Sequence, residues 1–260
     1  MRAVAIIQAR VGSTRLPGKV LLDLCGKPVL WHVVQRTRAA RLVHQVLVAT
    51  TSRPEDGEIE RLCRDWGTPI YRGPTDDVLA RYHGAVGYLD RIGVPVDRIV
   101  RITADCPLID PGVIDRGIRE SEEKDSDYLS NIDPPTYPDG LDVEVFTRHT
   151  LEITHREATL PSDREHVTPY MRRNGRFKTW NIRAGRDLSP LRWTLDTRED
   201  YLFIREVYRR LFPAKNLFTM DDVTGLLADH PELSKINGHL ARNVGYRISR
   251  EGNTHMGGVK

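Results

Sequence analysis

The chain has 260 residues, enough for one large α/β domain with a buried core, and its 39% apolar and 29% charged residues exclude a disordered chain. A net charge of only +3, without a basic helix or aromatic residues interleaved with basic ones, argues against nucleic-acid binding. No run of about 18 apolar residues occurs and the three cysteines have no paired spacing, so we expect a cytoplasmic protein with reduced thiols that does not insert into a membrane.

The first half of the chain alternates short apolar runs with longer amphipathic segments. The apolar runs have the length and composition of buried strands and lie at residues 4–7, 46–49, 70–71 and 99–102. The amphipathic segments predict helices that begin at Pro28, run over 55–66, follow an N-cap at Asp76 and follow Pro111. This alternation predicts an α/β fold, with a mostly parallel sheet and helices on both faces. Ligands of such sheets bind at the carboxyl edge of the strands, just after Ile7, Ala49 and Ile102.

The second half of the chain is less regular. Residues 133–140 contain three prolines and a glycine and are expected to form a loop, and Val143 and Val145 alternate with acidic residues as in a half-exposed strand. Further elements are expected as helices at 147–157, at 163–174, from the Thr197–Asp200 capping box to Leu211 and from Asp221, and as strands at 177–182 and 192–195. No linker or repeat is evident, so we expect one domain over residues 1–249 and a flexible tail at 250–260.

The strongest motif occupies residues 8–19, directly after the first strand, and reads Gln-Ala-Arg-Val-Gly-Ser-Thr-Arg-Leu-Pro-Gly-Lys. Its two glycines allow tight turns that bring backbone N–H groups close to an anion, and its two arginines and one lysine add positive charge that suits phosphate oxygens. It is not a Walker loop, because the Gly-Lys-Ser/Thr sequence is absent. The motif predicts a nucleoside triphosphate site that includes Gln8, Ala9, Arg10, Gly12, Ser13, Thr14, Arg15 and Lys19.

The same motif resembles the signature of the sugar cytidylyltransferases, which include the 3-deoxy-manno-octulosonate and acylneuraminate cytidylyltransferases. It is most similar to their SpsF-like branch of spore-coat polysaccharide biosynthesis. Further matches follow in order at residues 72–81, 101–108, 137–144, 164–168 and 192–200, so the resemblance runs from residue 2 to about 230. It implies a nucleotide-diphospho-sugar transferase-like fold and transfer of CMP from CTP to a sugar for surface polysaccharide biosynthesis. It also implies an acidic 2-keto-3-deoxy sugar as acceptor, Mg²⁺ as cofactor and a homodimer.

The resemblance assigns chemistry to residues beyond the loop. It implies two metal-binding aspartates, Asp105 at the end of the fourth strand and Asp196, and oxygen ligands suit Mg²⁺. Each has a plainer alternative, because Asp105 could belong to a turn and Asp196 could favour a helix dipole. The implied catalytic residues are Arg15, Lys19 and Asp105, which would act while a sugar hydroxyl attacks the α-phosphorus and pyrophosphate leaves in line.

Nucleotide and acceptor contacts are expected at further positions. The nucleotide side is expected to include Arg72, Asp77 and Thr103, with 50–52 as a pocket wall or a polar loop. A surface ion pair between Asp77 and Arg81 is the alternative for that aspartate. The acceptor side is expected to include Asp139, Asp142, Glu144, Arg164, His166 and Arg192. The alternatives there are a solvated strand face for the carboxylates and ordinary helix-entry residues for Arg164 and His166. Arg192 could also balance charge beside the metal aspartate.

Two other functions share parts of this pattern. A nucleoside-diphosphate-sugar-dependent glycosyltransferase would have the same architecture, but it usually carries an Asp-x-Asp pair, whereas Asp105 is followed by Cys106-Pro107. A catalytically silent nucleotide-binding protein would keep the loop, and the intact Lys19, Asp105 and Asp196 argue against it. The sequence identifies no general base, which a metal-lowered hydroxyl pKa could make unnecessary.

Overall fold

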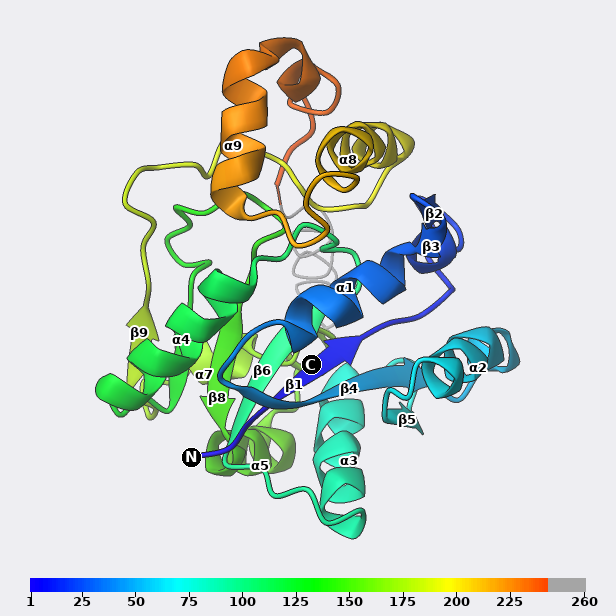
Figure 1. The fold of residues 1–260 in the computed structure, drawn as a ribbon. Coiled ribbons are helices and arrows are strands. Elements are labelled where there is room, and N and C mark those ends of the chain that lie inside the picture. The colour runs from blue at the N-terminus through cyan, green and yellow to red at the C-terminus, as the bar shows by residue number, and fades with distance from the viewer. Residues whose placement is uncertain (243–260) are drawn as a thin grey trace, which may run out of the picture.

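A seven-stranded sheet forms the centre of the fold (Figure 1). The computed structural model describes residues 1–242, so the tail expected at 250–260 lies outside the described residues. In spatial order the strands are β5 (Ile70–Gly73), β4 (Val43–Thr51), β1 (Ala3–Gln8), β6 (Arg98–Thr103), β8 (Glu144–Thr147), β7 (Tyr128–Ser130) and β9 (Thr179–Asn181). Within the described chain, β8 runs antiparallel to both neighbours and the other pairs of this sheet are parallel, which confirms the mostly parallel sheet.

Two layers of helices cover the sheet, because its central strands are apolar on both sides. Along β1, Ala3, Ala5 and Ile7 belong to one core cluster, and Val4 and Ile6 belong to the other. The first cluster includes side chains of α1 (Val29–Arg38), α2 (Gly57–Asp65), α4 (Pro111–Glu123), α8 (Arg198–Leu211) and α9 (Met220–Asp229). The second includes side chains of α3 (Val78–Arg91), α5 (Arg148–Glu157) and α7 (Pro169–Arg173). The expected helices on both faces are therefore confirmed.

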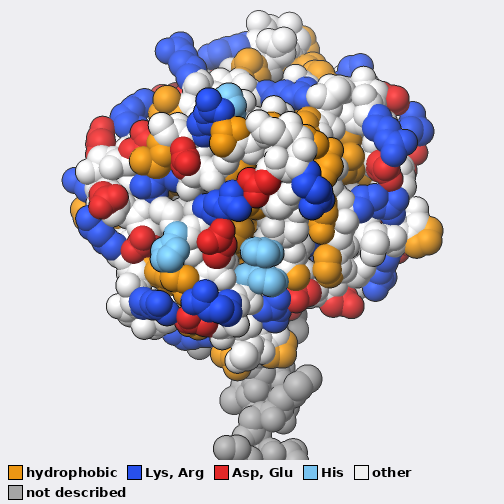
Figure 2. Space-filling model, turned by 90° about the horizontal axis from the view of Figure 1, so that it is seen from below, with side chains coloured by type: hydrophobic (Ala, Val, Ile, Leu, Met, Phe, Trp, Pro, Cys, Tyr) orange, Lys and Arg blue, Asp and Glu red, His pale blue; other side chains and the backbone are white. Residues whose placement is uncertain are grey.

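Short segments complete the described chain. They are η1 (Lys19–Leu21), β2 (Asp23–Leu24), β3 (Lys27–Pro28), η2 (Pro54–Asp56), α6 (Pro161–His166) and η3 (Pro231–Lys235). No helix within residues 1–242 is both long and apolar enough to cross a bilayer. On the face shown in Figure 2, basic and acidic side chains are interspersed, so this face lacks the uniformly basic surface typical of nucleic-acid binders.

Polar side chains cap two helices that matter for the site. Thr197 and Asp200 form the predicted capping box at the start of α8, where each side chain accepts a hydrogen bond from the other residue's backbone amide. The cap of α3 differs by one position from the prediction. Asp77, not Asp76, accepts a hydrogen bond from the Ala80 amide at 2.8 Å. The side chain of Asp76 is therefore available for another role.

Three predictions in the second half of the chain are wrong. β8 is not half exposed, because it lies between β6 and β7 and residues 144–146 are buried. Residues 192–195 form no strand and make only an isolated bridge to the loop at 133–140. The helix predicted at 163–174 is two short helices, α6 and α7, because Val167 between them has a left-handed φ of 71° that a continuing helix cannot accommodate. The first two errors arise from tertiary contacts that a local pattern does not encode, whereas Pro169, the first residue of α7, is a local signal for a helix boundary.

Candidate active site

The segment that follows β1 folds back on itself and is held by backbone hydrogen bonds. The Gly18 amide donates to the Val11 carbonyl at 3.1 Å, and Gly18 has a left-handed φ of 68° that favours glycine. The Val11 amide donates to the buried carboxylate of Asp56 at 2.7 Å. These contacts fix the shape of the loop, which leads directly into η1 with Lys19 at its first position.

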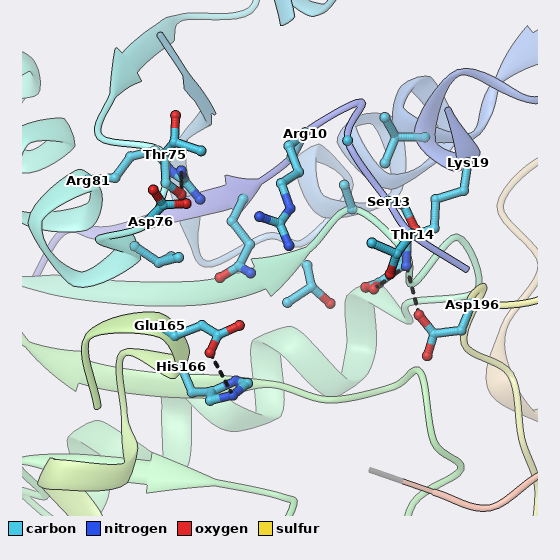
Figure 3. A pocket seen from close by; sticks show the side chains of 18 of the residues that line it. Arg10, Ser13, Thr14, Lys19, Thr75, Asp76, Arg81, Glu165, His166 and Asp196 are labelled. Carbon is cyan, nitrogen blue, oxygen red and sulfur yellow. Dashed lines mark hydrogen bonds and ion pairs between the residues drawn. The ribbon is translucent and has the colours of Figure 1, made fainter. Parts of the chain in front are cut away.

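A cavity of about 770 Å³ opens at the carboxyl edge of β1 and β6, beside this loop (Figure 3). The predicted site residues that line it are Gln8, Ala9, Arg10, Gly12, Ser13, Thr14, Arg15, Lys19, Thr103, Asp105, His166 and Asp196. The other lining residues, which were not among the candidate site residues, are Val20, Thr75, Asp76, Val78, Arg81, Ala104, Pro161 and Glu165. The residues at the end of β4, at 50–52, do not line the cavity.

Lys19 and two aspartates form the charged centre at one end of the cavity. The Lys19 Nζ atom lies 2.9 Å from Asp105 Oδ2 and 2.8 Å from Asp196 Oδ1, and Arg15 contacts the other oxygen of Asp196 at 3.0 Å. The Leu195 amide donates to the Asp105 carbonyl at 2.8 Å, which joins the two aspartate segments through the backbone. The sequence analysis named all three charged groups, and the structure brings them together.

Burial and charge compete in setting the protonation of this centre. Burial lowers the pKa of Lys19, but the charges of Asp105 and Asp196 outweigh burial and raise the pKa above its ordinary value. Burial raises the pKa of Asp105, but the Lys19 ammonium and hydrogen bonds outweigh burial and hold the pKa at about 2. Lys19 is therefore protonated and Asp105 is ionised at neutral pH.

The two aspartates are suitable ligands for a hard divalent cation. Mg²⁺ is usually held by one or two carboxylates together with substrate phosphates and water, rather than by a cage of protein side chains. Among the described residues no group of three or more His, Cys, Asp or Glu side chains has metal-binding geometry, so a cation here would depend on the substrate for further ligands. The ionised Asp105 and its neighbour Asp196 fit that requirement.

The opposite end of the cavity lies between β5 and α3 and contains Thr75, Asp76 and Arg81 (Figure 3). Arg81 is 2% exposed and donates to the Pro74 carbonyl at 2.8 Å, while its buried Nε has no hydrogen-bond partner among the described residues. A buried donor without a partner is costly and indicates a position where a ligand could accept a hydrogen bond. The carboxyl-edge rule, applied to β5, would have found this end of the site.

Three residues that were predicted to belong to the site, Arg72, Asp77 and Arg164, lie near this end but outside the cavity lining. Arg72 pairs with Glu60 at 2.8 Å and donates to two backbone carbonyls, which fastens β5 to α2. Asp77 caps α3 with one carboxylate oxygen and pairs with Arg164 through the other at 2.7 Å. These contacts account for all three side chains as structural groups, and the Arg81 partner suggested for Asp77 is replaced by Arg164.

The remaining predicted acceptor residues also lie outside the lining, with His166 as the exception. Glu144 is buried and accepts hydrogen bonds from Tyr128 and Thr168, at 2.7 Å each, besides pairing with Arg101 at 2.6 Å. Its carboxylate is fully engaged within the protein, so Glu144 does not present the solvated strand face that was the alternative to an acceptor-binding role. His166 lies on the cavity wall beside Glu165, with 3.8 Å between Nε2 and Oε2.

Arg192, Asp139 and Asp142 belong to an ionic network next to the charged centre, in which Arg192 and Asp139 are buried and Asp142 is partly exposed. Arg192 contacts Asp139 at 3.1 Å and Asp196 at 3.4 Å. Its Nε and Nη2 atoms also donate to the two carboxylate oxygens of Asp200, at 2.9 Å each. Asp142 forms an ion pair with Arg242, which lies in the C-terminal segment of the described chain. Arg192 therefore supports the metal-binding candidate Asp196 from behind and is not directed at an acceptor.

Comparisons with known proteins agree with this geometry. Residues 4–214 match the family described as cytidylyltransferase. The chain is 33% identical to the spore coat polysaccharide biosynthesis protein SpsF of Bacillus subtilis over 79% of this chain and 85% of that protein. It is 41% identical to a 3-deoxy-manno-octulosonate cytidylyltransferase of Geobacter sulfurreducens over 45% of this chain and 44% of that protein. A cytidylyltransferase structure from Leptospira borgpetersenii superposes with a TM-score of 0.82 and 31% identity, covering 90% of this chain and 96% of that one. The chain belongs to the cytidylyltransferase family of nucleotidyltransferases.

Proposed function

We propose that the protein transfers CMP from CTP to a hydroxyl group of a sugar, with Mg²⁺ as cofactor, for surface polysaccharide biosynthesis. The hydroxyl oxygen forms a bond to the α-phosphorus, the bond from that phosphorus to the bridging oxygen breaks, and pyrophosphate leaves as the hydroxyl proton is released. The observation that supports this proposal is the Lys19–Asp105–Asp196 centre at the end of the glycine-containing loop, inside the cavity of about 770 Å³.

The charges of the cavity support a divalent cation as a participant. Its lining holds four cationic side chains (Arg10, Arg15, Lys19, Arg81) and four anionic ones (Asp76, Asp105, Glu165, Asp196), so these charges sum to zero. The lining alone cannot neutralise the charge of a triphosphate. Mg²⁺ held by Asp105 and Asp196 would supply the missing positive charge at the phosphates.

The loop and the centre have distinct roles in this proposal. The loop amides and Arg10 bind the triphosphate, and Lys19 and Arg15 stabilise the charge that develops on the leaving pyrophosphate. The nucleoside occupies the β5–α3 end, where the free Nε of Arg81 and the carboxylate of Asp76 offer one donor and one acceptor to a base. Gln8 and Thr103 lie between these ends, at the carboxyl termini of β1 and β6.

The acceptor is the least constrained part of the proposal. His166 and Glu165 form the wall below the loop in Figure 3 and are the side chains in best position to contact it. An acidic 2-keto-3-deoxy sugar is the proposed class, supported by the identity to a 3-deoxy-manno-octulosonate cytidylyltransferase.

Thermal unfolding with each nucleoside triphosphate, with and without Mg²⁺, tests the proposal. A ligand at 100 times its dissociation constant stabilises a protein by about 2.7 kcal/mol, so a specific ligand is readily detected. We expect the largest Mg²⁺-dependent shift with CTP, followed by pyrophosphate release when an acidic 2-keto-3-deoxy sugar is added. A shift with a nucleoside-diphosphate sugar but with no triphosphate would contradict the proposal.

A further inference from the structure

The loop that carries Asp196 is organised around one buried carboxylate. Asp200, which is 0% exposed, accepts hydrogen bonds from the backbone amides of Asp196 and Thr197, at 3.0 Å each. The guanidinium of Arg192 donates two hydrogen bonds to the same carboxylate, from Nε and Nη2, at 2.9 Å each. The direction in which Asp196 points is therefore set by Asp200 and Arg192 rather than by its own side-chain contacts alone.

Asn237 closes this arrangement from a distant part of the chain. It lies beyond α9 and η3, is 2% exposed, and donates from its side-chain nitrogen to Asp200 Oδ1 at 2.9 Å and to the Arg192 carbonyl at 3.0 Å. The side-chain amide of Asn237 thus connects the backbone of Arg192 to the Asp200 carboxylate, around which the segment carrying Asp196 folds. The Arg192 carbonyl and Asp200 Oδ1 are buried, so replacing the Asn237 amide by a group that cannot donate would leave both acceptors without this hydrogen bond.

The residues that follow Asn237 make further contacts with the same region. The Ala241 carbonyl accepts a hydrogen bond from Arg192 at 3.2 Å, and Arg242 contacts Asp142 at 2.8 Å and Asp139 at 3.8 Å. The residues matched by the cytidylyltransferase family end at 214, so these supports lie beyond that match. The segment is therefore built against the back of the charged centre.

We propose that Asn237 is a positioning residue for Asp196, and that the segment at 231–242 sets the place from which the Asp196 carboxylate binds a divalent cation together with CTP. This inference rests on the metal-binding role of Asp196 in the proposed function. Partners that orient a metal ligand usually change metal affinity by about 10- to 100-fold when they are replaced. Asn237 acts through Asp200 and Arg192 and touches neither nucleotide nor metal.

The test is calorimetric titration of the full chain with CTP in EDTA and with the Mn²⁺–CTP complex. The variant Asn237→Asp keeps the size of the side chain and replaces the donor by an acceptor that faces Asp200 Oδ1 and the Arg192 carbonyl. We expect it to weaken Mn²⁺–CTP binding by about tenfold and to change binding of metal-free CTP by less than about twofold. The milder Asn237→Ser, which retains one donor, should lose less and serves if the first variant does not fold.

The matched control separates positioning from a general loosening of the C-terminal segment. Thr219→Ala removes the cap of α9 but touches neither Asp200 nor Arg192, so it should lower thermal stability and leave Mn²⁺–CTP affinity unchanged. In the unaltered protein, Mn²⁺–CTP should slow amide hydrogen exchange at 231–242 more than metal-free CTP does, because the coupling is reciprocal.

The outcomes are distinguishable. If the unaltered protein binds Mn²⁺–CTP no more tightly than metal-free CTP, the metal role in the proposed function fails and this inference fails with it. If the unaltered protein prefers Mn²⁺–CTP and both Asn237 variants keep that preference, the inference alone is overturned. Equal losses in the Thr219→Ala control would also overturn it, because the effect would then not be specific to Asn237.

Discussion

Replacing Glu144 by glutamine separates a structural role from the acceptor-binding role expected from the sequence. Glu144 is 1% exposed and neutralises Arg101, whose Nε is buried without a partner in the described chain. In the variant, the Tyr128 and Thr168 hydroxyls can still donate to a carbonyl oxygen, but the new amide leaves the guanidinium of Arg101 without a counter-charge. The change therefore creates an uncompensated buried cation.

Breaking a buried ion pair by removing one partner costs about 3 to 5 kcal/mol, and the lower value applies because Arg101 keeps 15% of its side chain exposed. For a chain of this size, about 3 kcal/mol lowers the melting temperature by roughly 6 to 12 °C. The control Glu152→Gln removes an exposed i,i+4 pair with Arg148 and should cost about 0.5 kcal/mol or less.

The assay is urea unfolding of both variants, followed by steady-state kinetics at a temperature where both are folded. We expect Glu144→Gln to be strongly destabilised, with little change in the KM for the acceptor. A variant that is as stable as the control but has a tenfold higher acceptor KM would refute the reasoning and restore Glu144 as an acceptor ligand.

Three further predictions address other groups. Asp105→Asn should abolish pyrophosphate release while circular dichroism shows a folded protein, because the variant cannot hold a cation against the phosphates; full activity would contradict the metal role. Lys19→Ala should weaken binding of CTP far more than binding of CMP, measured by calorimetry, and equal losses would remove Lys19 from the leaving pyrophosphate. Burial lowers the pKa of His32 to about 4 in the folded protein, whereas the unfolded pKa is near 6.5. The unfolded chain therefore takes up a proton at a higher pH than the folded protein, and the folded state loses stability as the pH falls from 6.5 toward 4. Between pH 6 and 4 the unaltered protein should lose more unfolding free energy than His32→Gln, with the steepest difference near pH 5 at up to about 1.4 kcal/mol per pH unit, and parallel curves in urea titrations would contradict this.

The sequence predicted the loop side of the cavity well because that side is local. The loop residues from Gln8 to Lys19 follow one strand without interruption, so the strand pattern alone places them at the carboxyl edge. The box formed by Thr197 and Asp200 was also predictable, since both partners lie within one turn. The N-cap of α3 shows the limit of such local predictions, because it lies at Asp77 and not at Asp76.

The parts that could not be predicted depend on partners far along the chain. Glu144 looks like a solvated carboxylate in sequence, but Arg101 and Tyr128 from neighbouring strands make it a buried one. Arg192 looks like a free cation beside a metal ligand, but Asp200 and the C-terminal segment engage it. A single sequence gives no distance between such groups, so their burial and pairing become visible only in the fold.

The backbone hydrogen bond from Leu195 to Asp105 joins a segment that is synthesised late to one that is synthesised early. A nascent chain that has emerged as far as α5 already contains the complete N-terminal loop, yet it lacks Asp196. Synthesis proceeds from the N-terminus, so Lys19 and Asp105 are both present in the nascent chain before Asp196, the second carboxylate in contact with Lys19, has been made. The charged centre is thus one of the last parts of the cavity to be completed, and a translation product truncated before residue 196 would retain the loop but lack the second carboxylate.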